Sequence, residues 1–193
     1  MKVRLSVICL ALWLKNRGVN MTEITSMNEQ LDWTREKPRQ FWDPSRKLLR
    51  TIRQYQQCAQ SKNIMRRKLL TKWIVIKHRF WSVITGADID LRCQIGGGLL
   101  LPHPNGIVIH PITIISDNFF IFQKVTIDPN GKRPIPSITT DHVNIGVVAK
   151  LLGNITVGYL AKIGANAFVT KNVSAKATAV GIPATIKINK EIA

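Results

Sequence analysis

Cysteine is scarce in this sequence, and no metal-ligand pattern accompanies it. The three cysteines, Cys9, Cys58 and Cys93, are an odd number without Cys-x-x-Cys spacing. This argues against a disulfide framework and a zinc site, and it favours a reducing compartment. The four histidines also lack ligand spacing, and no carboxylate cluster lies near them, so we expect no metal cofactor.

Acidic residues are scarce too: eleven Asp and Glu face twenty-eight Lys and Arg, which gives a net charge of +17. The excess is concentrated between Arg35 and Arg79, where fourteen basic residues accompany only Glu36 and Asp43. Such a block indicates an anionic partner, either a membrane surface or a charged substrate, or else a solvated helical face. The sequence has no helix-turn-helix, zinc-finger or RNP pattern, so we expect no nucleic-acid partner.

The N-terminus lacks a membrane span. Lys2 and Arg4 precede ten uncharged residues, Leu5–Leu14, which are too few to cross a bilayer. The segment resembles the apolar part of a signal peptide, but no Ala-x-Ala-like cleavage site follows it. It is either a short buried or interfacial helix, or a stretch that precedes a true start at Met21.

An aliphatic residue, or a substitute for one, returns at every sixth position from Ile95 onward. One series is Ile95, Leu101, Ile107, Thr113, Phe119 and Val125, and the second is Ile145, Leu151, Val157, Ile163 and Val169. A helix repeats about every 3.6 residues and a strand about every 2, so a period of six predicts a parallel β-helix. Glycines follow the second series at Gly146, Gly158 and Gly164, where we expect corners that need positive φ.

The two series are separated by twenty residues, which six does not divide. Asp128–Pro136 is rich in turn residues and lies in this gap. We therefore predict that a loop leaves the coil there and contributes the two residues by which twenty exceeds three hexads. Loops held by a rigid scaffold often carry function.

Two helices are expected before the β-helix. Asp43 is a good N-cap and Pro44 suits a first helical position, which predicts a helix from Pro44 to Ser61. A second helix is predicted from Asn63 to Ile84, ended by Gly86. Its apolar stripe is expected to be core that covers the first coil, and consists of Leu69, Leu70, Trp73, Ile76, Phe80 and Val83.

Six stretches within residues 86–186 carry a family resemblance. They are Ala87-Asp88-Ile89-Asp90, Ile95-Gly96-Gly97-Gly98, His103-Pro104-Asn105-Gly106-Ile107, Lys150-Leu151-Leu152-Gly153-Asn154-Ile155, Ala161-Lys162-Ile163-Gly164-Ala165-Asn166-Ala167 and Ala179-Val180-Gly181-Ile182-Pro183. Together they resemble the serine acetyltransferase branch of the hexapeptide-repeat acyltransferases. The resemblance implies a mainly β fold, a left-handed parallel β-helix preceded by an N-terminal basic α-helical region.

The sequence patterns and the resemblance together assign domains, partners and a location. We expect an extension and linker at 1–40, a basic helical region at 41–85 and a tail at 187–193, and the resemblance implies a β-helix acetyltransferase domain at 86–186. We expect a homotrimer, with a dimer of trimers as an alternative. The expected location is cytoplasmic, with peripheral contact at the inner, anionic membrane face as an alternative.

The catalytic pair that the resemblance implies is His103 and Asp88, fifteen residues apart. A hydroxyl must lose its proton as it attacks the thioester of acetyl-CoA, and a neutral imidazole can take that proton and return it to the leaving thiolate. A carboxylate on the other ring nitrogen orients the imidazole and stabilises its charged form. A spacing close to one coil of eighteen would bring the two residues together.

Further site residues are expected beside this pair. For the acceptor we assign Arg133, one residue away from the family's Arg position, with His110 in a supporting or structural role. For acetyl-CoA, the co-substrate, the positions that match the family are Ala149, Gly153, Ala165 and Ala167, and we add Lys150 and Lys171 for their charge. The small residues among these also suit tight corner packing, and the lysines suit the CoA phosphates.

Several positions depart from the family pattern. Pro102 stands where the family has an Asp, and Arg133-Pro134-Ile135-Pro136 replaces the Asp-Arg-His-Pro run that holds the serine carboxylate. Because these changes affect acceptor recognition, the sequence favours a sugar of a surface polysaccharide or its precursor as the acceptor. L-serine is the alternative, and a non-catalytic trimeric scaffold is the alternative outside enzymes.

Overall fold

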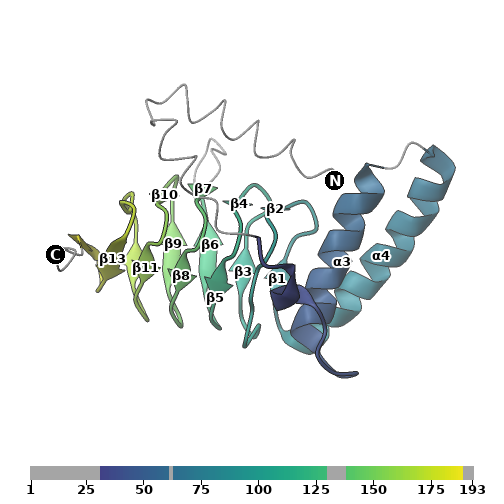
Figure 1. Cartoon of the computed structure of the whole chain (residues 1–193), viewed down its shortest axis with the longest axis horizontal. Helices are drawn as coiled ribbons and strands as arrows, with labels where there is room; N and C mark the ends of the chain where they lie inside the picture. Colours follow the sequence, from purple (N-terminus) through teal and green to yellow (C-terminus); the bar gives the residue numbers. More distant parts are fainter. Residues whose placement is uncertain (1–30, 61–62, 130–137, 189–193) are drawn as a thin grey trace. The chain divides into compact units, whose positions relative to one another are not determined.

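The computed structural model describes residues 31–60, 63–129 and 138–188. The chain divides into two compact units, residues 1–30 and Leu31–Ala193, and all the described residues belong to the second. Within it, two helices precede a solenoid of short strands (Figure 1). No helix among the described residues is long and apolar enough to cross a membrane.

The solenoid has three flat faces, each a sheet of parallel strands from successive coils. Sheet 1 holds β1 (Asp88–Ile89), β3 (Val108–Ile109), β6 (Thr126–Asp128), β9 (Lys150–Leu152) and β12 (Phe168–Val169). Sheet 2 holds β2 (Gln94–Ile95), β4 (Ile114–Ile115), β7 (Ile138–Thr139) and β10 (Thr156–Val157). Sheet 3 holds β5 (Phe120–Ile121), β8 (Asn144–Ile145), β11 (Lys162–Ile163), β13 (Ala177–Val180) and β14 (Thr185–Ile188), of which β14 pairs antiparallel to β13. The predicted fold class is confirmed, although strand structure runs to Ile188, into the stretch predicted as a tail.

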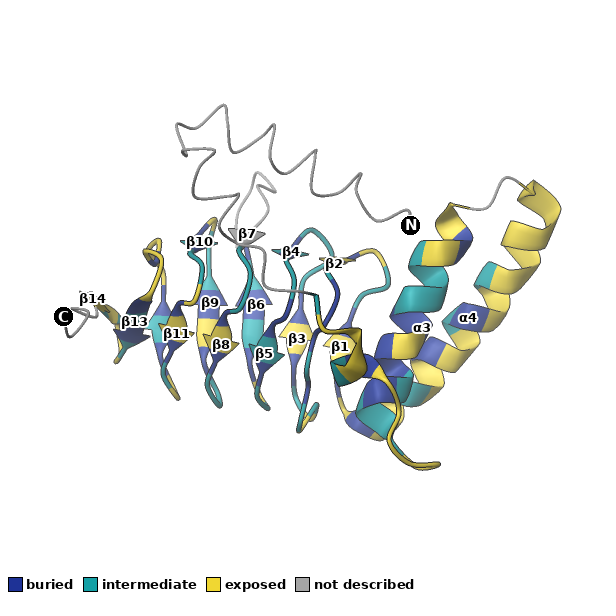
Figure 2. Cartoon of the chain, viewed as in Figure 1, coloured by how far each residue is buried: buried dark blue, intermediate teal, exposed yellow. Residues whose placement is uncertain are grey.

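Successive side chains of each short strand point alternately outward and inward, so the inward ones form a core along the solenoid axis. In β3, for example, Val108 faces outward and is 40% exposed, while Ile109 is 2% exposed. The inward residues stack coil upon coil as one continuous apolar column, seen as dark blue bands in Figure 2. Burial of aliphatic side chains of this kind contributes roughly 1.5–3 kcal/mol each.

The hexad register shifts at one corner. Asp88 pairs with Val108 and Leu100 bridges Phe120, in both cases twenty residues apart, whereas Val108 and Thr126 are eighteen apart. The two additional residues therefore lie between Leu100 and Val108, in the corner that holds His103.

The segment that contains the predicted loop adds a different number of residues to its coil from the two that were predicted. Ile114 pairs with Ile138, twenty-four residues on, so the segment between β6 and β7 adds six residues, one whole hexad. The prediction that this loop contributes the two residues in excess of whole hexads is wrong, because those two residues lie in the His103 corner. Most of the predicted loop lies outside the described residues.

The glycines that follow the inward residues serve close packing rather than positive φ. Gly146, Gly158 and Gly164 are not among the positive-φ glycines, so that expectation is wrong. Corner residues with left-handed backbone are instead mostly not glycine: Asn118, Lys124, His142, Val148, Leu160, Asn166 and Lys176. A Cβ built at Gly146 would lie 2.7 Å from the backbone N of Ala165, on the next coil.

We expect Gly146→Ala to lower the free energy of unfolding by about 1–3 kcal/mol, because its Cβ would press against backbone that cannot move freely. Chemical denaturation followed by circular dichroism measures the change. Asn144→Ala, at an exposed position two residues earlier, is the control and should change stability by less than about 0.5 kcal/mol. Equal stability of the glycine and alanine proteins would contradict the close-packing explanation.

The two predicted helices are confirmed, with small differences at their ends. Helix α3 runs Pro44–Ala59 and helix α4 runs Ile64–Thr85. The Asp43 side chain caps α3 by accepting from the Arg46 N–H, and Gly86 ends α4 with a φ of 65°. These are the caps expected from sequence.

The predicted packing of α4 is wrong. Its buried residues are Ile74, His78 and Thr85, which face α3 and the first coil. The stripe predicted as core is exposed instead, and its members range from Leu70 at 41% to Val83 at 83%. Among the described residues, the side of α4 that carries Ile74 and His78 packs inward, and it lies opposite the predicted stripe.

His78 links both helices to the solenoid. Its Nε2 lies 2.9 Å from the Ile89 carbonyl oxygen and its Nδ1 lies 3.0 Å from Thr51 Oγ1. The carbonyl can only accept, so Nε2 carries a hydrogen. Burial lowers the pKa of His78, which favours the neutral ring in the folded protein.

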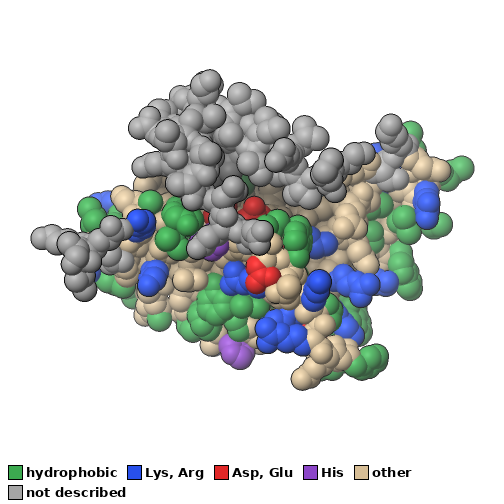
Figure 3. All heavy atoms as spheres, in the orientation of Figure 1, with side chains coloured by type: hydrophobic (Ala, Val, Ile, Leu, Met, Phe, Trp, Pro, Cys, Tyr) green, Lys and Arg blue, Asp and Glu red, His purple; other side chains and the backbone are tan. Residues whose placement is uncertain are grey.

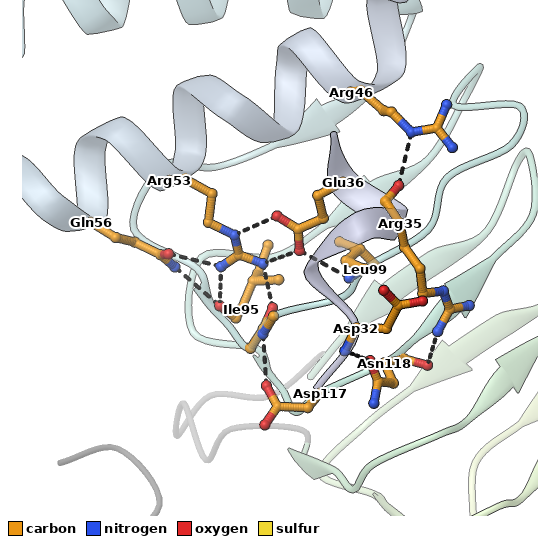
Figure 4. A network of polar contacts seen from close by, with 12 residues as sticks. Asp32, Arg35, Glu36, Arg46, Arg53, Gln56, Ile95, Leu99, Asp117 and Asn118 are labelled. Carbon is orange, nitrogen blue, oxygen red and sulfur yellow. Dashed lines mark hydrogen bonds and ion pairs between the residues drawn. The ribbon is translucent and has the colours of Figure 1, made fainter. Parts of the chain in front are cut away.

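The segment before α3 packs on the solenoid, although the sequence predicts a linker there. It contains a short 3-10 helix, η1 (Trp33–Glu36), whose Glu36 is buried. Figure 4 shows Glu36 joined to Arg53 of α3, with Nε–Oε2 and Nη2–Oε1 distances of 2.8 and 2.7 Å. The same guanidinium donates to the Ile95 and Gly96 carbonyl oxygens, so one side chain holds η1, α3 and the first coil together.

Candidate active site

The outward face of sheet 1 is the surface around which most of the predicted site residues lie. Strand pairing places five outward residues in one column along it, from the first coil to the last: Asp88, Val108, Thr126, Lys150 and Phe168. The corner that leads into this sheet from sheet 3 forms one edge of the face. The corner that leads from this sheet to sheet 2 forms the other.

His103 lies at the first of these edges, in the corner with the two added residues. Its side chain is exposed between Pro102 and Pro104. A hydrogen bond from the Gly106 N–H to the Gly86 carbonyl oxygen, at 2.7 Å, fixes this corner to the end of α4. A second hydrogen bond, from the Lys124 N–H to the Asn105 carbonyl oxygen at 2.9 Å, fixes it to the equivalent corner of the next coil. The backbone around the imidazole is therefore fixed while its ring faces solvent.

Asp88 begins β1, directly after the segment that supports the His103 corner. It is exposed, and its N–H donates to the Ile107 carbonyl oxygen at 2.8 Å. Asp88 and His103 therefore lie on adjoining coils at the same edge of sheet 1. The carboxylate of Asp88 is also close enough to influence the pKa of His78, although burial has the larger effect on that ring.

The other predicted acceptor residues are placed differently. His110 follows β3, so it lies in the corner at the far end of that strand from His103. Its Nδ1 accepts from the Ile112 N–H at 3.4 Å, an arrangement typical of a turn residue. Arg133 lies outside the described residues.

The predicted CoA residues are distributed over both edges of sheet 1. Ala149, Ala165 and Ala167 lie on the edge that holds His103, and Gly153 and Lys171 lie on the other. Ala149 and Ala167 are buried in the core, and their backbone groups bond within the solenoid, which favours the packing role for these two. Lys150 and Lys171 are exposed and project cations near the sheet 1 face.

A pocket of about 310 Å³ opens beside the His103 corner. Its solenoid wall is Leu100, Leu101 and Pro102, and its helical wall is Arg39, Asp43, Ser45 and Arg46. Sequence reasoning missed this pocket, because it forms between segments about sixty residues apart in the chain. The available signal was the basic block itself, which supplies both arginines.

Among the described residues, one of the two arginines in the pocket wall has a carboxylate partner within the pocket and the other has none. Asp43 pairs with Arg46 at 2.9 Å. Partial burial opposes ionisation of Asp43, but hydrogen bonds from Arg46 and Arg39 outweigh it and hold its pKa below the usual value. Arg39 is exposed, so the pocket is positive overall and suits an anionic or zwitterionic ligand.

The described residues hold no group of three or more His, Cys, Asp or Glu that could bind a metal. Cys93 is buried, and burial raises the pKa of its thiol to about 12, so it stays protonated near neutral pH. The chemistry available at the face of sheet 1 is therefore that of an exposed imidazole, a carboxylate and nearby cations.

No family model matches the chain. Among curated proteins, the serine acetyltransferase of Buchnera aphidicola is 41% identical over 109 residues, which are 54% of this chain and 41% of the relative. That of Escherichia coli strain K12 is 42% identical over 108 residues, 54% of this chain and 39% of the relative. This chain thus matches less than half the length of these relatives.

Solved structures give the same result. A serine acetyltransferase in complex with CoA superposes with a TM-score of 0.61 at 33% identity, over 75% of this chain and 57% of that one. A soybean serine acetyltransferase complexed with serine has a TM-score of 0.59 at 30% identity, over 74% of this chain and 55% of that one.

The coil period, the three parallel sheets and the corner residues define a hexapeptide-repeat β-solenoid protein. Over the matched part, the chain is similar to serine acetyltransferases, which is consistent with the hexapeptide-repeat acyltransferase family. The resemblance seen in the sequence is confirmed.

Proposed function

We propose that this chain is an acetyl-CoA-dependent O-acetyltransferase with L-serine as its acceptor. The observation that carries the proposal is the placement of His103 and Asp88 at one edge of sheet 1, in a chain homologous to serine acetyltransferases. The sugar acceptor favoured by the sequence has less support, because the matched structures are serine acetyltransferases, one bound to CoA and one to serine.

In the proposed reaction, the His103 imidazole takes the proton of the acceptor hydroxyl as its oxygen attacks the thioester carbonyl carbon. The bond between that carbon and sulfur then breaks, and the imidazolium returns the proton to the CoA thiolate. Asp88 orients the ring and stabilises the imidazolium. Lys150 and Lys171 supply point charges for the CoA phosphates.

Acceptor choice in this proposal depends on the pocket beside His103. A serine carboxylate needs a cation when it leaves water, and the exposed Arg39 in the pocket wall can provide a two-point contact. Arg133 is a second candidate for the same role. The sugar acceptor keeps two observations in its favour, which are Pro102 at the family's Asp position and Arg133-Pro134-Ile135-Pro136 in place of the family's Asp-Arg-His-Pro run.

We expect Arg39→Gln to raise KM for L-serine about tenfold or more with a smaller change in kcat, since a hydrogen bond to a charged group is lost. CoA release from acetyl-CoA measures both constants. Arg50→Gln, an exposed arginine on α3 outside the pocket, is the matched control and should behave like the wild type.

The acceptor is tested by the same assay with L-serine, nucleotide sugars and oligosaccharides at equal concentration. Release of CoA with L-serine supports the proposal. Release with a sugar alone would replace L-serine as the acceptor but keep the enzyme class. No release with any hydroxyl acceptor would favour the trimeric scaffold. The trimer itself is tested by light scattering of the purified chain.

A further inference from the structure

The outer face of α4 carries an apolar stripe. Leu69, Trp73, Ile76, Phe80 and Val83 are separated alternately by four and three residues, so they lie along one side of the helix. Their exposed fractions run from 54% to 83%. Figure 2 shows α4 largely yellow, with dark blue bands where it packs on α3. These five residues form the outer-face stripe.

Cations border the stripe on both sides. At about 100° per residue, Arg66 and Lys77 fall along one border and Lys68, Lys72 and Arg79 along the other. All five are exposed. The Lys77 Nζ lies 5.5 Å from the centroid of the Trp73 ring, so the cationic border and the stripe are in contact. Helix α4 contains no Asp or Glu.

The positive charge continues beyond the helix. In the face drawn in Figure 3, blue side chains gather over the helical part of the molecule while red ones are few. A contiguous exposed apolar patch usually marks an interaction site. Its cationic borders require an occupant that is apolar along the centre and negative at the edges.

We propose that the outer-face stripe binds the surface of an anionic phospholipid bilayer. Trp73 and Phe80 would enter the boundary between headgroups and acyl chains, where aromatic side chains are favoured. The bordering Lys and Arg side chains would lie along the surface with their charges at the lipid phosphates. The binding concerns location and does not depend on the proposed acetyl transfer.

A second copy of the chain fits the stripe less well. Two α4 helices packed stripe to stripe would bring their cationic borders together, and like charges beside such a seam oppose association. A bilayer with anionic lipid supplies the missing negative charge without any acidic residue from the protein. Charge complementarity therefore favours the lipid surface.

The test is sedimentation of the full chain with phosphatidylcholine vesicles, with and without about one-third phosphatidylglycerol. We expect binding to the anionic vesicles, weak binding to the neutral ones, and a marked loss between about 0.05 M and about 0.5 M salt. Lys68→Gln/Lys72→Gln/Arg79→Gln should lower the partition coefficient about a hundredfold. Trp73→Ser/Phe80→Ser should lower it at least tenfold, as two apolar contacts are lost.

Matched controls separate this face from general charge and hydrophobicity. Lys162→Gln/Lys187→Gln removes exposed cations from the solenoid, and Ile182→Ser/Ile188→Ser removes exposed apolar side chains there; both should bind vesicles like the wild type. All substituted positions are exposed, so the variants are expected to fold, and circular dichroism checks this.

Three results would overturn the proposal. The first is binding to anionic vesicles no stronger than binding to neutral ones, and the second is vesicle binding that the α4 substitutions leave unchanged. The third is an oligomer that forms without lipid and is dissociated by Trp73→Ser/Phe80→Ser, which would identify a second copy as the occupant. Acetyl transfer to a soluble acceptor is measured in parallel, so failure of lipid binding and failure of the proposed enzyme are distinguished.

Discussion

Replacing His103 with alanine is expected to lower kcat of the proposed acetyl transfer by about 10²- to 10⁴-fold, with KM for acetyl-CoA little changed. General-base catalysis by a positioned imidazole contributes about that factor, and methyl cannot accept the hydroxyl proton. Steady-state release of CoA with saturating acceptor measures the loss. Because the imidazole is exposed and the corner is held by backbone bonds, the substitution should not disturb the fold.

The temperature of unfolding provides the control for that experiment. We expect His103→Ala and the wild type to unfold within a few degrees of each other, which would attribute the loss of rate to chemistry. Asp88→Asn should also lower kcat, because the amide orients the ring less well and cannot stabilise the imidazolium. A His103→Ala protein with wild-type kcat would remove His103 from the mechanism.

Much of the fold could be predicted from local signals. Asp43, Pro44 and Gly86 act through neighbouring backbone groups, and the ends of both helices were predicted to within two residues. The hexad period predicted the solenoid because each inward aliphatic packs on its equivalent one coil away. The pair at Asp88 and His103 followed from a resemblance, and the strand register then brought both to one edge.

The errors arise where two distant parts of the chain decide the outcome. Gly146 is required by the backbone of Ala165 on the next coil, which a preference for positive φ does not reveal. The stripe on α4 looked like core because aromatic and aliphatic residues at helical spacing usually are. The side of α4 that packs on α3 and the first coil is the one whose His78 hydrogen-bonds to Ile89 and Thr51. Local sequence patterns do not predict these contacts.

The segment at Asp32–Glu36 shows the same limit for polar contacts. Its composition resembles a linker, yet the Glu36 carboxylate accepts from Arg53 and from the Leu99 N–H, at 3.0 Å for the latter. The Arg35 guanidinium likewise donates to the Asn118 carbonyl oxygen at 2.9 Å. Two of these partners, Leu99 and Asn118, are more than sixty residues away, and they hold the polar stretch against the solenoid. The same segment contacts the pocket lined by Arg39 and Arg46, because the Arg46 Nε donates to the Arg35 carbonyl oxygen at 2.8 Å.

The largest change in stability is expected from Arg53→Met, which should lower the free energy of unfolding by about 3–5 kcal/mol. The Arg53 and Glu36 side chains are 14% and 7% exposed, so the substitution leaves a buried carboxylate without its cation. It also removes the Arg53 donor to the Gly96 carbonyl oxygen and one of two donors to that of Ile95, where Gln56 Nε2 remains at 3.2 Å (Figure 4). Such a loss is a large fraction of the total stability of a domain, about 5–15 kcal/mol.

Chemical denaturation of four proteins tests the origin of that loss: wild type, Arg53→Met, Glu36→Leu and the double variant. Because replacing both members of a buried ion pair removes the isolated charge, the double variant should be more stable than the sum of the single changes implies, by about 1–3 kcal/mol. Arg50→Gln, exposed on the same helix, should stay within about 0.5 kcal/mol of the wild type. Additive single changes, or an Arg53→Met loss as small as that of Arg50→Gln, would show that the pair does not hold η1 and α3 on the first coil.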